Sequence, residues 1–384
     1  MRFEFATATR IVFGPGSLSA VAPAMREMGS RVLLVVGRDS ERMKPLIQQL
    51  ESAGLACAIF HVAGEPTIES VREGVRTARE QRTDVVIGMG GGSAIDAGKA
   101  IAALLTNGSE PLDYVEVVGR GLPLLNPSAP FIAIPTTAGT GSEVTRNAVL
   151  SSPEHRVKAS LRSPHMLPRL AIVDPELTLA LPAPITASTG LDALTQLLEA
   201  WVSVRANPIS DGFCREGLPR IARSLRQACR QGSDIDARTD MSLASLFSGL
   251  ALANAGLGAV HGFAAPIGGM FDAPHGAVCA ALLPWVTAIN IAALQSRAPD
   301  SEALRRYREA AVMLIGRDGA SLADLVSWLR DLSGELGIPS LRAFGVTADQ
   351  FDVIVQKSAA ASSMKGNPIV LTASELREAL TQAL

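Results

Sequence analysis

Short apolar runs alternate with amphipathic stretches along the first half of the chain. Five of these runs are apolar at consecutive positions and rich in branched residues, as is typical of strands buried on both faces; they cover residues 31–37, 56–61, 84–90, 131–137 and 170–174. Residues 67–81 repeat apolar side chains at helical spacing, which predicts a helix that returns the chain to the next strand. This alternation predicts βαβ units and a mainly parallel sheet.

The pattern changes after the Leu-Pro-Ala-Pro sequence at residues 181–184. From there on, the chain is rich in alanine and leucine, its apolar positions recur with the helical period, and no strand is predicted. We therefore expect an α/β domain over residues 1–181 and a helical, all-α domain over residues 182–384, with the active site between them.

Composition supports two domains and excludes some partners. The chain has 384 residues, 47% of them apolar, which is enough for a core in each domain. Its 35 basic and 37 acidic residues form no block of like charge, so we expect no nucleic acid partner. No apolar run reaches the roughly 20 residues of a membrane-spanning helix, so we expect no membrane partner.

The cysteines and the first residues bear on the compartment. Four cysteines lie at scattered positions without a CxxC pair, which favours free thiols in a reducing environment. Residues 1–5 include an acidic residue, and no apolar stretch with a cleavage site follows. We therefore expect a cytoplasmic protein.

Two glycine-rich loops are the strongest chemical signal. Residues 88–93 (GMGGGS) end a predicted strand and open a predicted helix, so backbone N–H groups converge where an anion can bind. Taken alone, this run is equally consistent with a tight turn. A second loop, residues 135–142 (PTTAGTGS), follows another buried strand and offers four hydroxyls. Two such loops at strand ends indicate a dinucleotide site. Neither loop is GxGxxG, so we expect a topology different from the ordinary Rossmann fold.

These motifs, with four others, resemble those of a known family. In order, they are GGGSxxDxxK at residues 90–99, PTTAGTGSE at 135–143, DPELT at 174–178, GLDALT at 190–195, HGFAAP at 261–266 and PHG at 274–276. Over nearly its whole length the chain resembles the iron-containing (group III) alcohol dehydrogenases. The resemblance implies a Rossmann-like α/β dinucleotide-binding domain and a helical domain that holds a divalent metal ion, an architecture shared with dehydroquinate synthases. It also implies a homodimer that transfers hydride between nicotinamide and a small primary alcohol or aldehyde.

The resemblance implies a metal site in the helical domain. Asp192 and Gln196 lie one helical turn apart, so both can face a single ion. His261 and His275 fall in segments that resemble the ligand-bearing helices of the family. With Asp192 they form a set of two histidines and one carboxylate, which suits Fe²⁺ or Zn²⁺ and leaves room for a substrate oxygen. We therefore assign Asp192, His261 and His275 as catalytic, and these three with Gln196 as metal ligands.

Two residues depart from the family pattern. The family has histidine where this chain has Gln196, whose neutral amide is a poorer ligand for Fe²⁺ or Zn²⁺. Many relatives also carry a histidine near the nicotinamide where this chain has Ala265. An alternative therefore stays open, in which Asp192, Gln196, His261 and His275 form a hydrogen-bonded network without metal.

The end of the first predicted strand bears on the choice of cofactor. In the family, a carboxylate there binds the ribose of NAD and repels the 2′-phosphate of NADP. This chain has Gly37 there, followed by Arg38 and Ser40, which favours NADP over NAD, although a shift of one residue would place Asp39 near the ribose. The resemblance assigns further cofactor contacts to Gly90, Gly91, Gly92, Ser93, Asp96, Thr136, Thr137 and Thr140, and to Lys158 toward a ribose.

Four functions stay open at this point. The leading one is a metal-assisted, NAD(P)-dependent oxidoreductase acting on a small primary alcohol or aldehyde. The alternative that Gln196 and Ala265 support is a metal-independent NAD(P)H reductase resembling maleylacetate reductase. A lyase resembling dehydroquinate synthase is disfavoured by the PTTAGTGSE segment, and a nucleotide-binding protein without catalysis is the fourth. The sequence does not identify the alcohol or aldehyde.

Overall fold

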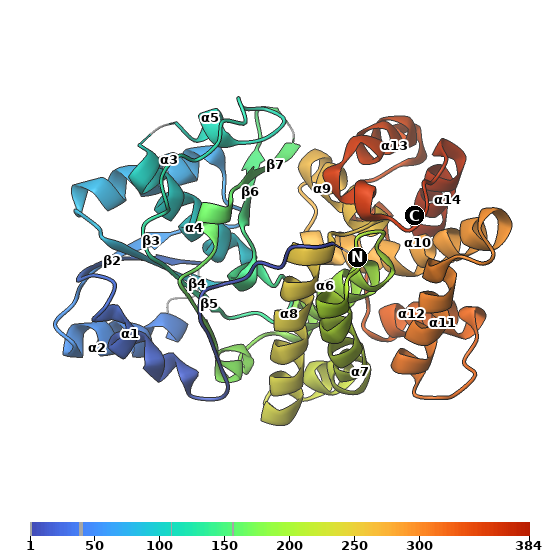
Figure 1. Cartoon of the computed structure of the whole chain (residues 1–384), viewed down its shortest axis with the longest axis horizontal. Helices are drawn as coiled ribbons and strands as arrows, with labels where there is room; N and C mark the ends of the chain where they lie inside the picture. The colour runs from blue at the N-terminus through green and yellow to red at the C-terminus, as the bar shows by residue number, and fades with distance from the viewer. Residues whose placement is uncertain (1, 38–40, 109, 156) are drawn as a thin grey trace. The chain divides into compact units, whose positions relative to one another are not determined.

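The computed structural model describes residues 2–37, 41–108, 110–155 and 157–384. Two units emerge from it, one formed by residues 6–180 and the other by residues 181–384 together with the first few residues (Figure 1). The N-terminal residues thus lie with the helical unit and not with the α/β unit. The ring of Phe5 stacks on Phe213 with centroids 5.9 Å apart, which holds this segment in place.

A six-stranded sheet forms the centre of the α/β unit. Its strand order is β1-β8-β5-β4-β2-β3, and every neighbouring pair is parallel. The strands are β1 (Ile11–Phe13), β2 (Arg31–Val36), β3 (Ala56–His61), β4 (Val85–Gly90), β5 (Phe131–Pro135) and β8 (Leu170–Val173). The predicted parallel sheet is confirmed, and the five predicted strands are among its six.

Helices cover both faces of this sheet (Figure 1). Leu33 and Val35 of β2 pack in one core with the helices α3 and α4, whereas Leu34 and Val36 pack in a second core with α1 and α2. This explains why the strands are apolar at consecutive positions. The helices of the unit are α1 (Val21–Met25), α2 (Lys44–Ser52), α3 (Ile68–Glu80), α4 (Gly92–Asn107) and α5 (Pro111–Tyr114).

Three strands were not predicted. β1 has only three residues, too few for a pattern to show. β6 (Asn147–Ser152) and β7 (Val157–Arg162) form a separate antiparallel pair. β6 alternates buried Ala148 and Leu150 with exposed Val149, so its apolar pattern is that of a strand covered on one face only.

The second unit is helical, and no strand occurs in residues 181–384, all of which the structure describes. Its helices are α6 (Ala183–Val202), α7 (Pro208–Arg230), α8 (Ile235–Ala255), α9 (Ala259–Phe271), α10 (His275–Arg297), α11 (Glu302–Ile315), α12 (Leu322–Glu335), α13 (Phe351–Ala360) and α14 (Ala373–Ala383). α6 packs against α7, α8 and α10, and most of its second half is buried. The side chains of α6 therefore face a protein interior on several sides.

Helix α10 is long and apolar enough to span a membrane by length and composition alone. Helices α8 and α9 are joined at a sharp bend, and they are long and apolar enough to span a membrane only when they are taken together as one segment. However, most of the apolar window of α10 is buried, since α6, α9, α12 and α14 pack around it. This burial is typical of the core helix of a globular unit.

Candidate active site

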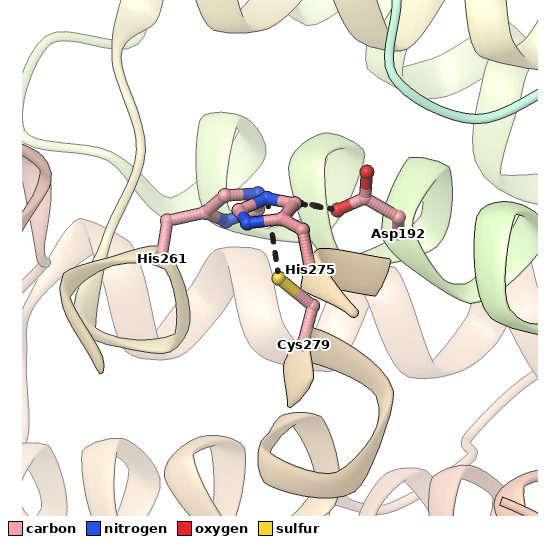
Figure 2. A group of neighbouring side chains, drawn as sticks. All are labelled: Asp192, His261, His275 and Cys279. Carbon is pink, nitrogen blue, oxygen red and sulfur yellow. Dashed lines mark hydrogen bonds and ion pairs between the residues drawn. The ribbon is translucent and has the colours of Figure 1, made fainter. Parts of the chain in front are cut away.

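Four side chains from three helices of the helical unit converge on one point (Figure 2). Asp192 lies in the middle of α6, His261 in the first turn of α9, and His275 and Cys279 in the first two turns of α10. One potential ligand atom from each lies within 4.8 Å of all the others. The structure thus brings together three of the four predicted ligands and adds a cysteine that was not predicted.

The distances within this group are those of atoms facing a shared centre. Asp192 Oδ1 lies 3.3 Å from Nε2 of His261 and 3.8 Å from Nε2 of His275. The Sγ of Cys279 lies 3.7 Å from Nε2 of His275. Asp192, His261 and Cys279 are buried, whereas the side chain of His275 is 38% exposed. His275 is therefore the member of the group that solvent contacts.

A glycine allows α10 to begin beside Asp192. A Cβ atom on Gly276 would lie 2.7 Å from the backbone oxygen of Ser188 in α6 and 3.6 Å from the Cβ of Asp192. Only glycine permits this approach of the two helices. His275 and Cys279 are four residues apart, so the start of α10 presents both to the same side.

Glu199 fixes the orientation of His261. Its Oε2 lies 2.7 Å from Nδ1 of His261, and its Oε1 accepts a 2.7 Å hydrogen bond from the backbone N–H of Val260. A carboxylate at Nδ1 keeps a proton there, so Nε2 is the nitrogen that faces Asp192. Glu199 follows Asp192 by seven residues on α6. That helical spacing is the signal that could have identified it.

Gln196 lies beside the group, and both ends of its amide have protein partners. Its Nε2 donates a 3.1 Å hydrogen bond to Oδ2 of Asp192, and its Oε1 accepts a 2.6 Å hydrogen bond from the hydroxyl of Ser248. The amide oxygen is the atom that would bind a metal ion. In this structure Gln196 therefore orients the Asp192 carboxylate.

Charges within the group shift its pKa values. Burial raises the pKa of Asp192, but the favourable interactions of the carboxylate with His261 and His275 outweigh this and leave it below the ordinary value. Burial lowers the pKa of both histidines, yet Cys279 and the neighbouring carboxylates leave them raised. Burial raises the pKa of the Cys279 thiol, and the two histidines lower it further than that. These shifts favour the ionised forms of Asp192 and Cys279 beside the protonated forms of His261 and His275.

The two predicted nucleotide loops lie side by side in the α/β unit. β4 and β5 are neighbours, with Gly90 paired to Pro135, and the N–H of Thr136 donates a 2.8 Å hydrogen bond to the oxygen of Gly90. A Cβ on Gly92 would lie 2.9 Å from Cγ2 of Thr140, so the loops pack too closely for a larger residue. No side chain caps the first turn of α4, and the first N–H groups of a helix can bind an anion.

Thr137 and Ser93 lie in these same loops, with Gly91 as the N-cap of α4, where a Cβ would be 3.5 Å from Thr137. Asp96 and Lys158, by contrast, have protein partners. Asp96 accepts hydrogen bonds from the hydroxyl of Ser142 and the N–H of Val149, and Lys158 pairs with Glu65 at 2.6 Å. Their side chains thus tie together segments of the α/β unit.

Gly37 directly follows β2, and a Cβ atom there would meet nothing within 4 Å. A side chain at this position would therefore meet none of the described residues. Arg38 and Ser40, the residues on which the predicted preference for NADP also depends, lie outside the described part of the chain.

Comparison with known proteins identifies the family of this chain. Residues 8–175 match the model of the iron-containing alcohol dehydrogenases, and residues 186–384 match the C-terminal model of the same family. A 1,3-propanediol dehydrogenase of Citrobacter freundii is 35% identical over 99% of this chain and 98% of its own length. An NAD-dependent methanol dehydrogenase of Bacillus methanolicus is 32% identical over 97% of each chain.

A solved structure gives the same result for the fold. The crystal structure of a 1,3-propanediol oxidoreductase superposes with a TM-score of 0.92 at 34% identity and covers 100% of both chains. The predicted architecture and alcohol dehydrogenase activity are thereby confirmed. The chain belongs to the iron-containing alcohol dehydrogenase family and is an oxidoreductase acting on alcohols.

Proposed function

We propose that this enzyme is a metal-assisted, NAD(P)-dependent dehydrogenase of small primary alcohols, or reductase of their aldehydes, in which Asp192, His261 and His275 hold the ion. One observation carries the proposal. Asp192 Oδ1 and His261 Nε2 are buried and have no hydrogen-bond partner, although they lie 3.3 Å apart. They face one another without the geometry of a hydrogen bond.

A divalent cation fits these atoms. A buried polar atom without a partner costs about 1–3 kcal/mol, so two in contact require an explanation. Fe²⁺ or Zn²⁺ accepts lone pairs from carboxylate oxygen and imidazole nitrogen, which are the atoms left without partners here. Glu199 forms a hydrogen bond with His261, and Gln196 forms one with Asp192. Such hydrogen bonds are typical of residues that orient metal ligands.

Each residue has a separate task in the reaction. When bound, the ion supplies Lewis-acid polarisation of the substrate oxygen. Glu199 keeps the Nδ1 proton of His261 in place, and Gln196 holds the Asp192 carboxylate in its rotamer. His275, the exposed member, lies where a small substrate reaches the group.

For the cofactor, we propose that the loops after β4 and β5 bind the dinucleotide and that NADP is preferred over NAD. The adjacent loops, the uncapped start of α4 and the open space at Gly37 support this. The sequence Arg38 to Ser40 supplies a cation and a hydroxyl for a 2′-phosphate. NAD is the alternative, and the assembly we propose is a homodimer.

Alanine variants of two ligands test the metal assignment. Asp192→Ala and His275→Ala each remove one donor, so we expect metal content and turnover to fall together, turnover by at least about 100-fold. The exposed His165 of the α/β unit gives a matched control, and His165→Ala should leave both unchanged. Full turnover in a metal-depleted Asp192→Ala protein would instead favour the metal-independent reductase.

A further inference from the structure

Cys279 lies beside the three proposed ligands. Its Sγ is 3.7 Å from His275 Nε2 and within 4.8 Å of the donor atoms of Asp192 and His261. Figure 2 shows the thiol pointing toward the imidazole rings from the next turn of α10. Its residue is fully buried, so the thiol has no contact with solvent.

Two of the separations are close to those of a metal-bound set. With bonds of about 2.0 Å to nitrogen or oxygen and 2.3 Å to sulfur, two nitrogen or oxygen donors of a tetrahedral zinc ion lie about 3.3 Å apart, and a nitrogen and a sulfur donor about 3.5 Å apart. The 3.3 Å between Asp192 and His261 and the 3.7 Å between His275 and Cys279 are close to these values, and the 3.8 Å between Asp192 and His275 is longer. The Sγ of Cys279 therefore faces the same centre as the Asp192 carboxylate and the two histidines.

Residue 196 does not compete for this role. The oxygen of Gln196 accepts a hydrogen bond from Ser248, and its nitrogen faces the other oxygen of Asp192. Both ends of the Gln196 amide thus already have protein partners. The thiol of Cys279 already faces His275.

We propose that Cys279, as a thiolate, is the fourth protein ligand of the metal ion, in place of residue 196, and that it shifts the preference of the site from Fe²⁺ toward Zn²⁺. The inference rests on the proposed function, since it presupposes that the group binds a metal ion. On binding, a Cys279 sulfur–metal bond forms and the thiol proton leaves to solvent. Thiolate is a soft ligand and favours Zn²⁺ over harder ions.

Cobalt substitution tests the assignment without relying on activity. The full chain is stripped with a chelator, loaded with Co²⁺, and examined for the near-ultraviolet charge-transfer absorption that a thiolate–Co²⁺ bond produces. We expect one Co²⁺ per chain and this absorption in the wild type, its loss in Cys279→Ser, and its retention in Gln196→Leu. Cys214→Ser is the matched control, because Cys214 is a buried thiol of α7 outside the group.

Metal competition gives a second readout. In anaerobic dialysis against equimolar Zn²⁺ and Fe²⁺, the ratio of bound Zn²⁺ to Fe²⁺ should fall by about tenfold in Cys279→Ser relative to the wild type. Wild-type protein that binds Co²⁺ without the absorption overturns the role of Cys279 and leaves the metal-assisted function standing, even if the variant fails to fold. Wild-type protein that binds no Co²⁺ overturns both.

Discussion

At the scale of single residues, Glu143 and Lys99 are both buried and interact electrostatically, with Glu143 in the short 3₁₀ helix Ser142–Val144 after β5. The ammonium of Lys99 donates hydrogen bonds to the oxygen of Ser142 and the hydroxyl of Thr145, each at 2.9 Å, and lies 3.1 Å from Asp96. Burial raises the pKa of Glu143 from 4.5 to about 7, although the charge of Lys99 lowers it in part. This carboxyl is therefore protonated in the folded protein under conditions in which it is ionised in the unfolded chain.

This shift makes stability depend on pH. Between pH 4.5 and about 7 the unfolded chain loses the Glu143 proton and the folded protein keeps it, so the contribution of this group to stability falls as pH rises. Glu143→Gln mimics the protonated form, so it should gain stability relative to the wild type across this window, by up to about 3 kcal/mol. Urea unfolding at several pH values measures the difference. If the free energies of unfolding of the two proteins changed with pH in parallel, Glu143 would not be a buried acid with a raised pKa.

Gly37 offers a test of cofactor choice at one residue. Gly37→Asp places a carboxylate at the end of β2 without a steric clash, since a Cβ there meets nothing within 4 Å. Repulsion of a 2′-phosphate should raise the Kd of NADP by about tenfold, or ~1.4 kcal/mol, with little effect on NAD. Gly37→Asn, equal in size and uncharged, is the control, and nucleotide titration is the measurement. An unchanged ratio of the two Kd values would mean that another residue contacts the ribose.

At the scale of elements, the site depends on how closely α10 begins against α6. A side chain on Gly276 would meet the backbone of Ser188, which cannot move without distorting α6. His275 flanks this contact and Cys279 follows one turn later. Displacing the start of α10 thus moves two members of the group together.

A larger residue in place of Gly276 should affect both the packing of α10 against α6 and the binding of metal. Gly276→Ala is expected to lower the free energy of unfolding by about 1–3 kcal/mol, and Gly276→Val by more, with weaker metal binding in both. The matched control is Gly212→Ala in α7, where a Cβ meets nothing within 4 Å; it should stabilise the protein by about 0.5–1 kcal/mol. Denaturant unfolding and metal titration provide the two readouts. A Gly276→Val protein with unaltered metal affinity would refute the proposed contact.

The sequence predicts the elements better than it predicts side-chain partners. The five central strands are visible because both of their faces are buried, whereas β1 is too short and β6 alternates. Asp192, His261 and His275 were found through motifs. Cys279 and Glu199 were missed because a thiol and a carboxylate on buried helices have many structural roles, although their spacings of four and seven residues from His275 and Asp192 were visible. The direction of the Gln196 amide depends on Ser248, which lies on another helix.

At the scale of the whole molecule, the metal group and the nucleotide loops belong to different units. The four converging side chains lie on α6, α9 and α10, and the two loops follow β4 and β5. The hydrogen bonds given above for these four side chains are all with residues of the helical unit. Each of the two groups is therefore built by one unit alone.

This separation predicts that metal removal spares nucleotide binding. Chelation should abolish turnover while the Kd of NADPH, followed by its fluorescence, changes less than about threefold. It should also lower the melting temperature of the helical unit, because a bound ion stabilises only the folded form. Loss of NADPH binding on chelation would contradict this independence.

The most direct measurement of the central claim is metal content paired with turnover. Protein purified anaerobically without chelators is analysed for metals and assayed with NADPH and NADH on short aldehydes, before and after EDTA treatment and metal addition. The account predicts about one Fe or Zn per chain, with activity that EDTA removes and the metal restores. Metal-free protein with full turnover would contradict it and would place the enzyme among the metal-independent reductases.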